Sequence, residues 1–202
     1  KAEGSGKNKA LTVAPIAADG KIFIFDADQT VFAIDAKTGK TLWENELKSG
    51  NKKDRRAFGG GMAVAGNKLI VASGYGFVSA HDVNTGKQIW KQQMIAPMTG
   101  SPTISSDRVF VASNNNEFYA LSLADGSINW SDQAIAESAR VLSSPSAAAI
   151  DDFVVAPYSS GEVIAYLPSN GRRLWTDSLT RSGRFTPISA INDIASRPVL
   201  SN

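Results

Sequence analysis

A fourfold internal repeat constrains the fold of this chain more than any other feature of its sequence. Each of the four tryptophans in the 202 residues follows a glycine by four positions and an alanine by ten. The alanines are Ala33, Ala80, Ala120 and Ala165, the glycines are Gly39, Gly86, Gly126 and Gly171, and the tryptophans are Trp43, Trp90, Trp130 and Trp175. Three residue types at fixed offsets, four times over, indicate four copies of one structural unit.

The spacing of the tryptophans predicts the type of unit. Successive tryptophans are 47, 40 and 45 residues apart, close to the ~40–45 residues of a four-stranded propeller blade. Each unit also contains a short apolar, β-prone run typical of a strand covered on both faces; the runs are 22–25, 69–71, 109–111 and 153–155. We therefore predict an all-β chain, a single partial β-propeller domain over 1–202. Its blades are expected at about 12–47, 59–94, 99–134 and 143–179, with a fifth beginning near 196.

The repeated residues have a packing explanation. A glycine between two strands supplies the positive φ of a tight hairpin turn. The tryptophan that follows is expected on the outermost strand, where its ring covers the seam to the neighbouring blade. The small alanine on the third strand leaves room for the indole. These twelve residues are predicted to be structural docking residues.

Composition argues against several functions. The 21 Lys and Arg nearly balance the 19 Asp and Glu, so we expect no nucleic-acid binding driven by bulk charge. The chain has no Cys and one His, which excludes Cys-ligated and multi-His metal sites and leaves little for His-based catalysis. We predict no metal site, no cofactor and no catalytic residue. His81 stands in register with Ile34 and Leu121, which predicts a hydrogen-bonded structural residue on a strand. The acidic residues Asp26, Asp28, Asp35 and Asp82 are expected at strand ends or turns rather than in one cluster.

The pattern Ala-x-Asp-x-x-Thr-Gly-x-x-x-Trp resembles the tryptophan-docking repeat of eight-bladed propellers of the pyrroloquinoline-quinone (PQQ) type. That superfamily includes quinone-dependent alcohol dehydrogenases and the non-enzymatic BamB-type lipoproteins, which belong to the machinery for outer-membrane β-barrel assembly. The resemblance implies about four blades plus the start of a fifth, which is half of an eight-bladed ring. Because a half ring leaves blade faces uncovered, we expect two copies to associate.

Two irregular segments favour the BamB type. The segment Glu137-Ser-Ala-Arg140-Val-Leu-Ser-Ser-Pro145 resembles the family loop that docks on a POTRA domain of BamA, and 191–200 resembles the segment beside that loop. The resemblance assigns partner binding to Arg140 and Asp193, with Val141 and Leu142 supplying the apolar contact. The match is incomplete, since Glu137 and Ala139 replace family leucines and Ala195 replaces a second acid.

The resemblance implies a non-catalytic scaffold at the periplasmic face of the bacterial outer membrane. A lipid anchor is expected upstream of residue 1. The expected partners are the POTRA domains of BamA and, at an exposed blade edge, unfolded strands of outer-membrane proteins. The alternatives are a PQQ-dependent dehydrogenase propeller and a periplasmic propeller sensor domain, because the repeat is common to all three.

Overall fold

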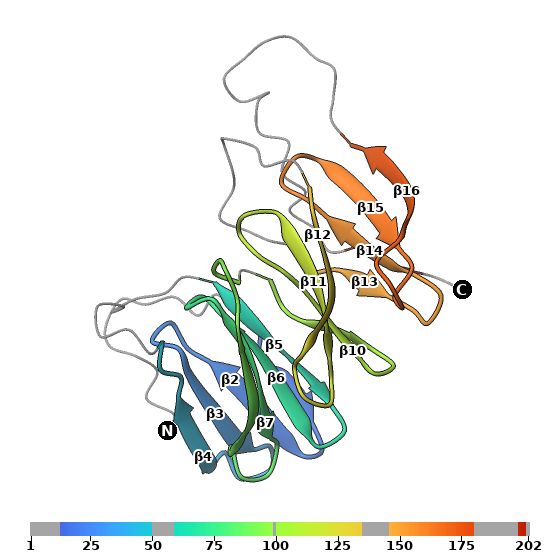
Figure 1. Ribbon diagram of the computed structural model, residues 1–202. Coiled ribbons are helices and arrows are strands. Elements are labelled where there is room, and N and C mark those ends of the chain that lie inside the picture. Colours follow the sequence, from blue (N-terminus) through green and yellow to red (C-terminus); the bar gives the residue numbers. More distant parts are fainter. Residues whose placement is uncertain (1–12, 50–58, 99, 135–145, 180–197, 201–202) are drawn as a thin grey trace. The chain divides into compact units, whose positions relative to one another are not determined.

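Four antiparallel sheets form the described part of the chain, which comprises residues 13–49, 59–98, 100–134, 146–179 and 198–200 of the computed structural model (Figure 1). Every sheet has four strands, which pair in the order of the sequence. These residues contain no helix, and hence no helical segment suited to crossing a membrane. The all-β prediction is confirmed.

The sixteen strands form four simple meanders. The first sheet contains β1 (Ile16–Ala18), β2 (Lys21–Phe25), β3 (Thr30–Asp35) and β4 (Thr41–Glu46). The second contains β5 (Gly60–Ala65), β6 (Lys68–Ser73), β7 (Phe77–Asp82) and β8 (Gln88–Gln93). The third contains β9 (Thr103–Ser105), β10 (Arg108–Ala112), β11 (Glu117–Ser122) and β12 (Ile128–Gln133). The fourth contains β13 (Ala148–Ala149), β14 (Val154–Pro157), β15 (Glu162–Tyr166) and β16 (Arg173–Ser178).

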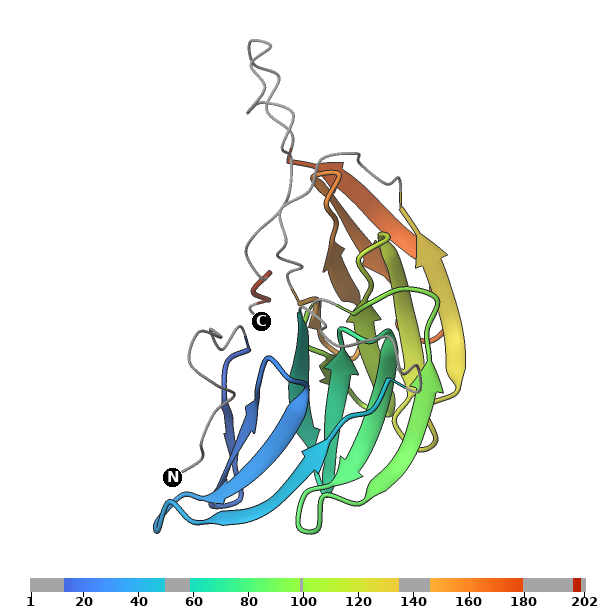
Figure 2. The same ribbon diagram turned by 90° about the vertical axis from the view of Figure 1, so that its left-hand side faces the viewer.

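The chain divides into two compact units, Lys1–Ser101 and Pro102–Asn202. The first unit holds the first and second sheets, and the second unit holds the third and fourth. Within the first unit the two sheets stack face to face (Figure 2). In each unit the first strands of the two sheets also contact one another, β1 with β5 and β9 with β13.

A β-bulge recurs beside every repeated alanine. Each alanine pairs with the tryptophan of its own unit, as Ala33 does with Trp43, and the register then shifts by one residue. The extra residue lies on the outermost strand directly before the tryptophan; these residues are Leu42, Ile89, Asn129 and Leu174. A bulge re-aims the side chain beside it, so all four indoles occupy the same register opposite a small residue.

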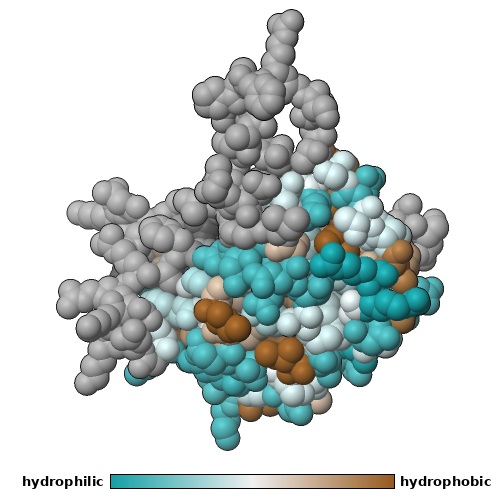
Figure 3. Space-filling model, turned by 45° about the horizontal axis from the view of Figure 1, so that its top comes forward, coloured by the Kyte–Doolittle hydropathy of each residue, from teal (hydrophilic) through white to brown (hydrophobic). Residues whose placement is uncertain are grey.

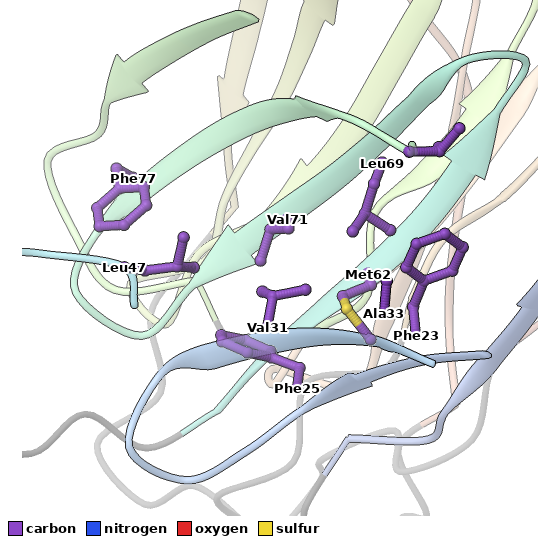
Figure 4. Packing of buried hydrophobic residues seen from close by; sticks show 10 residues of the cluster. Phe23, Phe25, Val31, Ala33, Leu47, Met62, Leu69, Val71 and Phe77 are labelled. Atoms are coloured by element: carbon purple, nitrogen blue, oxygen red, sulfur yellow. The ribbon is translucent and has the colours of Figure 1, made fainter. Parts of the chain in front are cut away.

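Each unit has its own apolar core between its two sheets. In the first unit, Phe25 and Val31 of the first sheet face Val71 of the second, and Phe23 and Met62 lie nearby (Figure 4). In the second unit the core is more aromatic; Phe110, Phe118, Tyr158 and Tyr166 are buried there. Burial of this apolar area is the main stabilising term of each unit.

The second strands of three sheets are covered on both faces, as their sequences predict. Residues 69–71, 109–111 and 154–155 are buried without interruption, whereas Phe153 of the predicted run 153–155 is half-buried and precedes β14. The first sheet differs, because β2 alternates between buried Phe23 and Phe25 and half-buried Ile22 and Ile24. Its apolar run therefore has one well-covered face, which packs on the second sheet.

Candidate functional site

The docking tryptophan of the first unit closes the seam between its two sheets. Trp43 extends from β4, and its Nε1 donates a hydrogen bond to the backbone oxygen of Val83 at 3.1 Å. Its ring lies against Gly86, so that a Cβ on this glycine would be 2.7 Å from Cε3 of the indole. On its inner side the ring centroid lies 6.0 Å from that of Phe23. The glycine therefore serves two purposes, the positive φ of its turn (+71°) and a flat surface for the preceding sheet's indole.

The second unit repeats this geometry. The Nε1 of Trp130 donates to the backbone oxygen of Pro168 at 2.8 Å, and a Cβ on Gly171 would lie 2.6 Å from Cδ2 of the indole. The ring also lies 5.5–6.0 Å from the rings of Tyr166, Phe118 and Phe110, measured between centroids. In both units the acceptor carbonyl precedes the glycine by three residues. The sequence indicated the turn, but not that the glycine would carry the indole of another sheet.

The remaining docking residues differ in burial. All four alanines are fully buried, as their position opposite an indole requires. Trp90 is buried, whereas Trp175 on β16 is 48 % exposed. Gly39 and Gly126 have φ values of +70° and +77°, like the other two glycines.

A buried glutamine joins the first two sheets at the end where β2 turns into β3. Gln29 closes this turn with φ +62° and is 1 % exposed. Its Oε1 accepts hydrogen bonds from the Ser73 hydroxyl at 2.6 Å and from the Gly74 amide at 3.1 Å. Its Nε2 donates to the backbone oxygen of Gly59 at 3.3 Å. The sequence repeat did not predict this role of Gln29, although the corresponding residue of every turn has a positive φ; these residues are Gln29, Gly76, Asn116 and Gly161.

Asn116 has the corresponding role in the second unit. Its Oδ1 accepts a hydrogen bond from the Ser159 hydroxyl at 2.7 Å, which links the β10–β11 turn to the β14–β15 turn. The same two turns anchor the ends of the outermost strands. The amide of Ala134 donates to the oxygen of Asn116 at 3.0 Å, and the amide of Leu179 donates to the oxygen of Gly161 at 2.9 Å. The chain thus leaves β12 and β16 from two turns that are tied together at one end of the unit.

A chain of hydroxyl groups crosses the core of the second unit. The Tyr158 hydroxyl lies 2.5 Å from that of Tyr166, and the Tyr166 hydroxyl donates to Oδ2 of Asp132 at 2.7 Å. Arg173 completes the chain, because its Nε donates to the same Asp132 oxygen at 2.8 Å. Burial raises the pKa of both tyrosines well above the usual value for a phenol. The tyrosines are therefore neutral donors at neutral pH, and the group is a structural link between sheets.

The acidic residues of the first unit stabilise turns. Oδ1 of Asp26 accepts hydrogen bonds from the amides of Asp28 and Thr30. Asp35 accepts from the amide and hydroxyl of Thr38, and Asp82 does the same with Thr85. These hydrogen bonds lower the pKa of Asp35 and Asp82, and the bond from the threonine hydroxyl has the largest effect. In the described ranges no three His, Asp or Glu side chains are gathered as metal ligands.

His81 is a buried structural residue, as its register predicts. It is 2 % exposed, and its Nδ1 lies 3.2 Å from the backbone oxygen of Gly86. The Nδ2 of Asn45 lies at the same distance from Nδ1, and the Ser79 hydroxyl lies 2.9 Å from Nε2. Burial lowers the pKa of His81, so the ring is neutral at neutral pH.

An open depression of about 200 Å³ lies on the first unit, and its lining consists of Glu46, Leu47, Lys48, Phe77, Gln88 and Lys91. The ammonium group of Lys91 lies 3.7 Å from the centroid of the Phe77 ring and donates to the backbone oxygen of Lys48 at 2.8 Å. Partial burial lowers the pKa of Lys91. This lysine holds the end of β4 against the second sheet.

Among the described residues, most exposed large apolar side chains lie on the outermost strands. Three of the large ones, Leu42, Ile89 and Leu174, are the extra residues of the bulges. On the part of the surface that is coloured in Figure 3, apolar side chains form separate patches among hydrophilic ones. The four predicted partner-binding residues, Arg140, Val141, Leu142 and Asp193, lie outside the described residues.

Comparison with known proteins identifies the family. A family model described as outer membrane protein assembly factor BamB matches residues 3–56 and 27–202. The outer membrane protein assembly factor BamB of Moranella endobia is 25% identical over 192 residues, which are 93% of this chain and 50% of that protein. The chain thus spans about half the length of this curated relative. The quinohemoprotein alcohol dehydrogenase ADH IIB of Pseudomonas putida is 31% identical over 119 residues, covering 54% of this chain and 17% of that protein.

The fold agrees with a solved structure of the same family. The crystal structure of BamB from Moraxella catarrhalis superimposes with a TM-score of 0.79 at 18% identity, covering 96% of this chain and 57% of that chain. The four sheets are therefore blades of a β-propeller, as predicted. With its tryptophan-docking repeats and a family match over nearly all of its length, the chain belongs to the BamB family of outer membrane protein assembly factors.

Proposed function

We propose that this chain is a non-catalytic scaffold for the assembly of outer-membrane β-barrel proteins, located at the periplasmic face of the outer membrane. Membership of the BamB family supports the assembly role. The regular, well-packed sheets suit a scaffold, because rigid elements present connecting segments in fixed positions.

The proposed partner is the POTRA region of BamA, bound through Arg140, Val141, Leu142 and Asp193. One observation carries this proposal. The two segments that contain these residues leave β12 and β16 at adjacent turns, which the hydrogen bond between Ser159 and Asn116 joins. Segments that start from neighbouring anchors can act on one partner surface.

The composition of the first segment suits a protein interface. An arginine beside two large apolar residues is typical of interface anchors, whose contribution exceeds that of the polar rim. Asp193 adds an acceptor for a basic group of the partner. Charge reversal at Arg140 is therefore expected to weaken binding more than removal of the side chain does.

A pull-down of the purified BamA POTRA domains tests this proposal. We expect the wild-type chain to be retained, Arg140→Ala to bind at least about tenfold more weakly, and Arg140→Glu to bind weakest. Arg172→Glu is the matched control, because Arg172 is exposed in the β15–β16 turn at the opposite end of the fourth sheet. Equal binding by Arg140→Glu and Arg172→Glu would remove Arg140 from the interface.

Unfolded strands of outer-membrane proteins are the second proposed partner. Among the described strands, β4, β8, β12 and β16 each pair with one neighbour only, and an unpaired edge can accept an added strand. An extended peptide from an outer-membrane protein is expected to bind, and its copy with alternate N-methylated amides is expected not to. Equal binding of both peptides would exclude pairing through the backbone.

The similarity to the Pseudomonas putida dehydrogenase supports a second candidate function, a PQQ-dependent dehydrogenase propeller. Incubation with the quinone and Ca²⁺ separates the two functions. Absorbance measures whether the chain binds the quinone, and a dye-linked assay measures alcohol oxidation. Stoichiometric quinone binding together with alcohol oxidation would show a dehydrogenase and contradict the scaffold proposal. A propeller sensor domain is the third alternative, and retention by BamA POTRA domains argues against it.

A further inference from the structure

The turn between β15 and β16 contains the chain's only Asn-Gly sequence. Asn170 precedes Gly171, and none of the other asparagines in the 202 residues is followed by glycine. Asparagine cyclises most readily before glycine, because the residue that supplies the attacking backbone nitrogen then has no side chain and turns freely. The other three hairpins of the repeat have a different residue at this place, namely Thr38, Thr85 and Asp125. The fourth hairpin is therefore chemically different from its three copies.

The place before the repeated glycine is open to solvent. Asn170 is exposed. In the first unit Thr38 is exposed although a following sheet packs against its own, and Thr85 is exposed although a preceding sheet does so. Exposure at this place is thus compatible with a packed neighbour on either side. Water and dissolved base can reach the side-chain amide of Asn170.

The indole of Trp130 holds the turn on both sides of Asn170. Its Nε1 donates to the backbone oxygen of Pro168 at 2.8 Å, and its ring lies against Gly171. The amide of Gly171 donates to the backbone oxygen of Leu167 at 3.0 Å. An amide held in this bond is not free to attack the neighbouring side chain, so cyclisation requires local opening of the hairpin.

We infer that Asn170 is a modification site, at which spontaneous deamidation proceeds through the Gly171 amide at a rate limited by the docking of Trp130. In the opened hairpin the Gly171 nitrogen gives its proton to a solvent base and attacks Cγ of Asn170. The new N–Cγ bond forms, the Cγ–Nδ2 bond breaks, and Nδ2 takes up a proton and leaves as ammonia.

The cyclic succinimide is then opened by water. Addition of water to one carbonyl carbon gives aspartate at position 170, and addition to the other gives isoaspartate. The sum of the steps consumes one water and releases one ammonia, so no oxidant or reductant takes part. This inference concerns a modification of the chain and is independent of the proposed assembly role.

The two products differ in their effect on the seam. Aspartate fits the turn, because Oδ1 of Asp125 accepts from the amide of Ser127 at 3.1 Å as Oδ1 of Asn170 does from that of Arg172. Isoaspartate routes the main chain through the side chain and lengthens it by one carbon just before Gly171. A Cβ on this glycine would already lie 2.6 Å from the indole, so the contact has no room for a displaced backbone. Isoaspartate is therefore expected to undock Trp130.

Incubation of the purified 202-residue chain in mildly alkaline buffer tests the site. Digestion at acidic pH and peptide mass spectrometry measure deamidation at each asparagine, and an isoaspartyl methyltransferase with its labelled methyl donor measures isoaspartate. We expect Asn170 to react at least about tenfold faster than Asn84, which is exposed in the corresponding hairpin but precedes Thr85. Asn170→Thr, which introduces the residue of the first two hairpins, should abolish the methyl label.

Variants of Trp130 test the control by docking. Trp130→Phe keeps a ring but loses the Nε1 donor, and Trp130→Ala loses both. The rate at Asn170 should rise in that order, by at least about tenfold for Trp130→Ala. Trp43→Ala is the matched control, because it removes the equivalent contact in the other unit and should leave the rate at Asn170 unchanged. Circular dichroism establishes that each variant is folded, and Trp130→Phe carries the test if Trp130→Ala is not.

The outcomes separate the two parts of the inference. Deamidation of Asn170 no faster than that of Asn84 would overturn the assignment of the site. A rate that the Trp130 variants leave unchanged, or that Trp43→Ala raises equally, would overturn control by docking.

Discussion

The indole of Trp43 rests on Gly86, a residue of the next sheet, so closely that a Cβ there would lie 2.7 Å from the ring. Gly86 is thus part of two adjacent blades, as is Gly171, which carries the indole of Trp130. In its own blade it closes the hairpin, and for the preceding blade it is the surface beneath the tryptophan. This shared residue couples local turn geometry to packing between sheets.

Gly86→Ala is expected to destabilise the chain more than Gly20→Ala. Both glycines have φ near +70°, but a Cβ on Gly20 meets nothing within 4 Å. The alanine at position 20 should therefore cost only the backbone penalty of about 1 kcal/mol. At position 86 overpacking adds about 1–3 kcal/mol. Urea denaturation measures both free energies of unfolding. In a Trp43→Ala background the two substitutions should cost the same, and a persisting difference would contradict the shared role.

Gln29→Gly should destabilise the first unit even though glycine relieves the positive φ. The substitution removes the partner of a fully buried hydroxyl, that of Ser73, and of the Gly74 amide. Buried groups left without partners cost about 1–3 kcal/mol each, which exceeds the backbone gain of about 1 kcal/mol. Asn116→Gly should cost less, because the linked Ser159 is only half-buried. Urea denaturation compares the two, and a stabilised Gln29→Gly chain would contradict the proposed link.

Tyr166→Phe should be more damaging than Tyr158→Phe. The Tyr166 hydroxyl accepts from Tyr158 and donates to Asp132, so its loss removes the acceptor of Tyr158 and one donor to Asp132, which keeps Arg173. We expect about 2–3 kcal/mol for Tyr166→Phe and about 1 kcal/mol for Tyr158→Phe. A double-mutant cycle in thermal or urea unfolding measures the coupling. Equal losses in the two single variants would show that the hydroxyl groups act independently.

His81 should make stability depend on pH below its unfolded-state pKa. Burial lowers the folded-state pKa from 6.5, so the unfolded chain binds a proton before the folded chain does. Stability is then complete above pH 6.5 and falls as the pH drops toward the folded-state pKa, by at most ~1.4 kcal/mol per pH unit.

The chain has a single His, which makes this test direct. The free energy of unfolding is measured between pH 7.5 and 5.5 for the wild type and for His81→Gln. The variant should be less stable at pH 7.5 but show a flatter profile. Parallel profiles would mean that His81 does not titrate differently in the two states.

The repeat alone determined the all-β class, the four units and the pairing of outer-strand tryptophans with third-strand alanines. These features depend on residues within about ten positions of one another. At that separation, turn residues and the alternation of apolar and polar residues can be recognised in the sequence. The resemblance carried by the repeat and the two irregular segments also led to the correct family.

Only the tertiary structure decided which residues fasten one sheet to the next. Trp43 reaches Gly86, Gln29 reaches Ser73, and Tyr166 reaches Asp132, each across more than thirty positions. Such contacts form only when two sheets pack face to face. No local pattern in a single sequence indicates which residues more than thirty positions apart will meet. The uneven burial of the tryptophans is likewise not indicated by the repeat, since buried Trp90 and half-exposed Trp175 occupy the same register opposite an alanine.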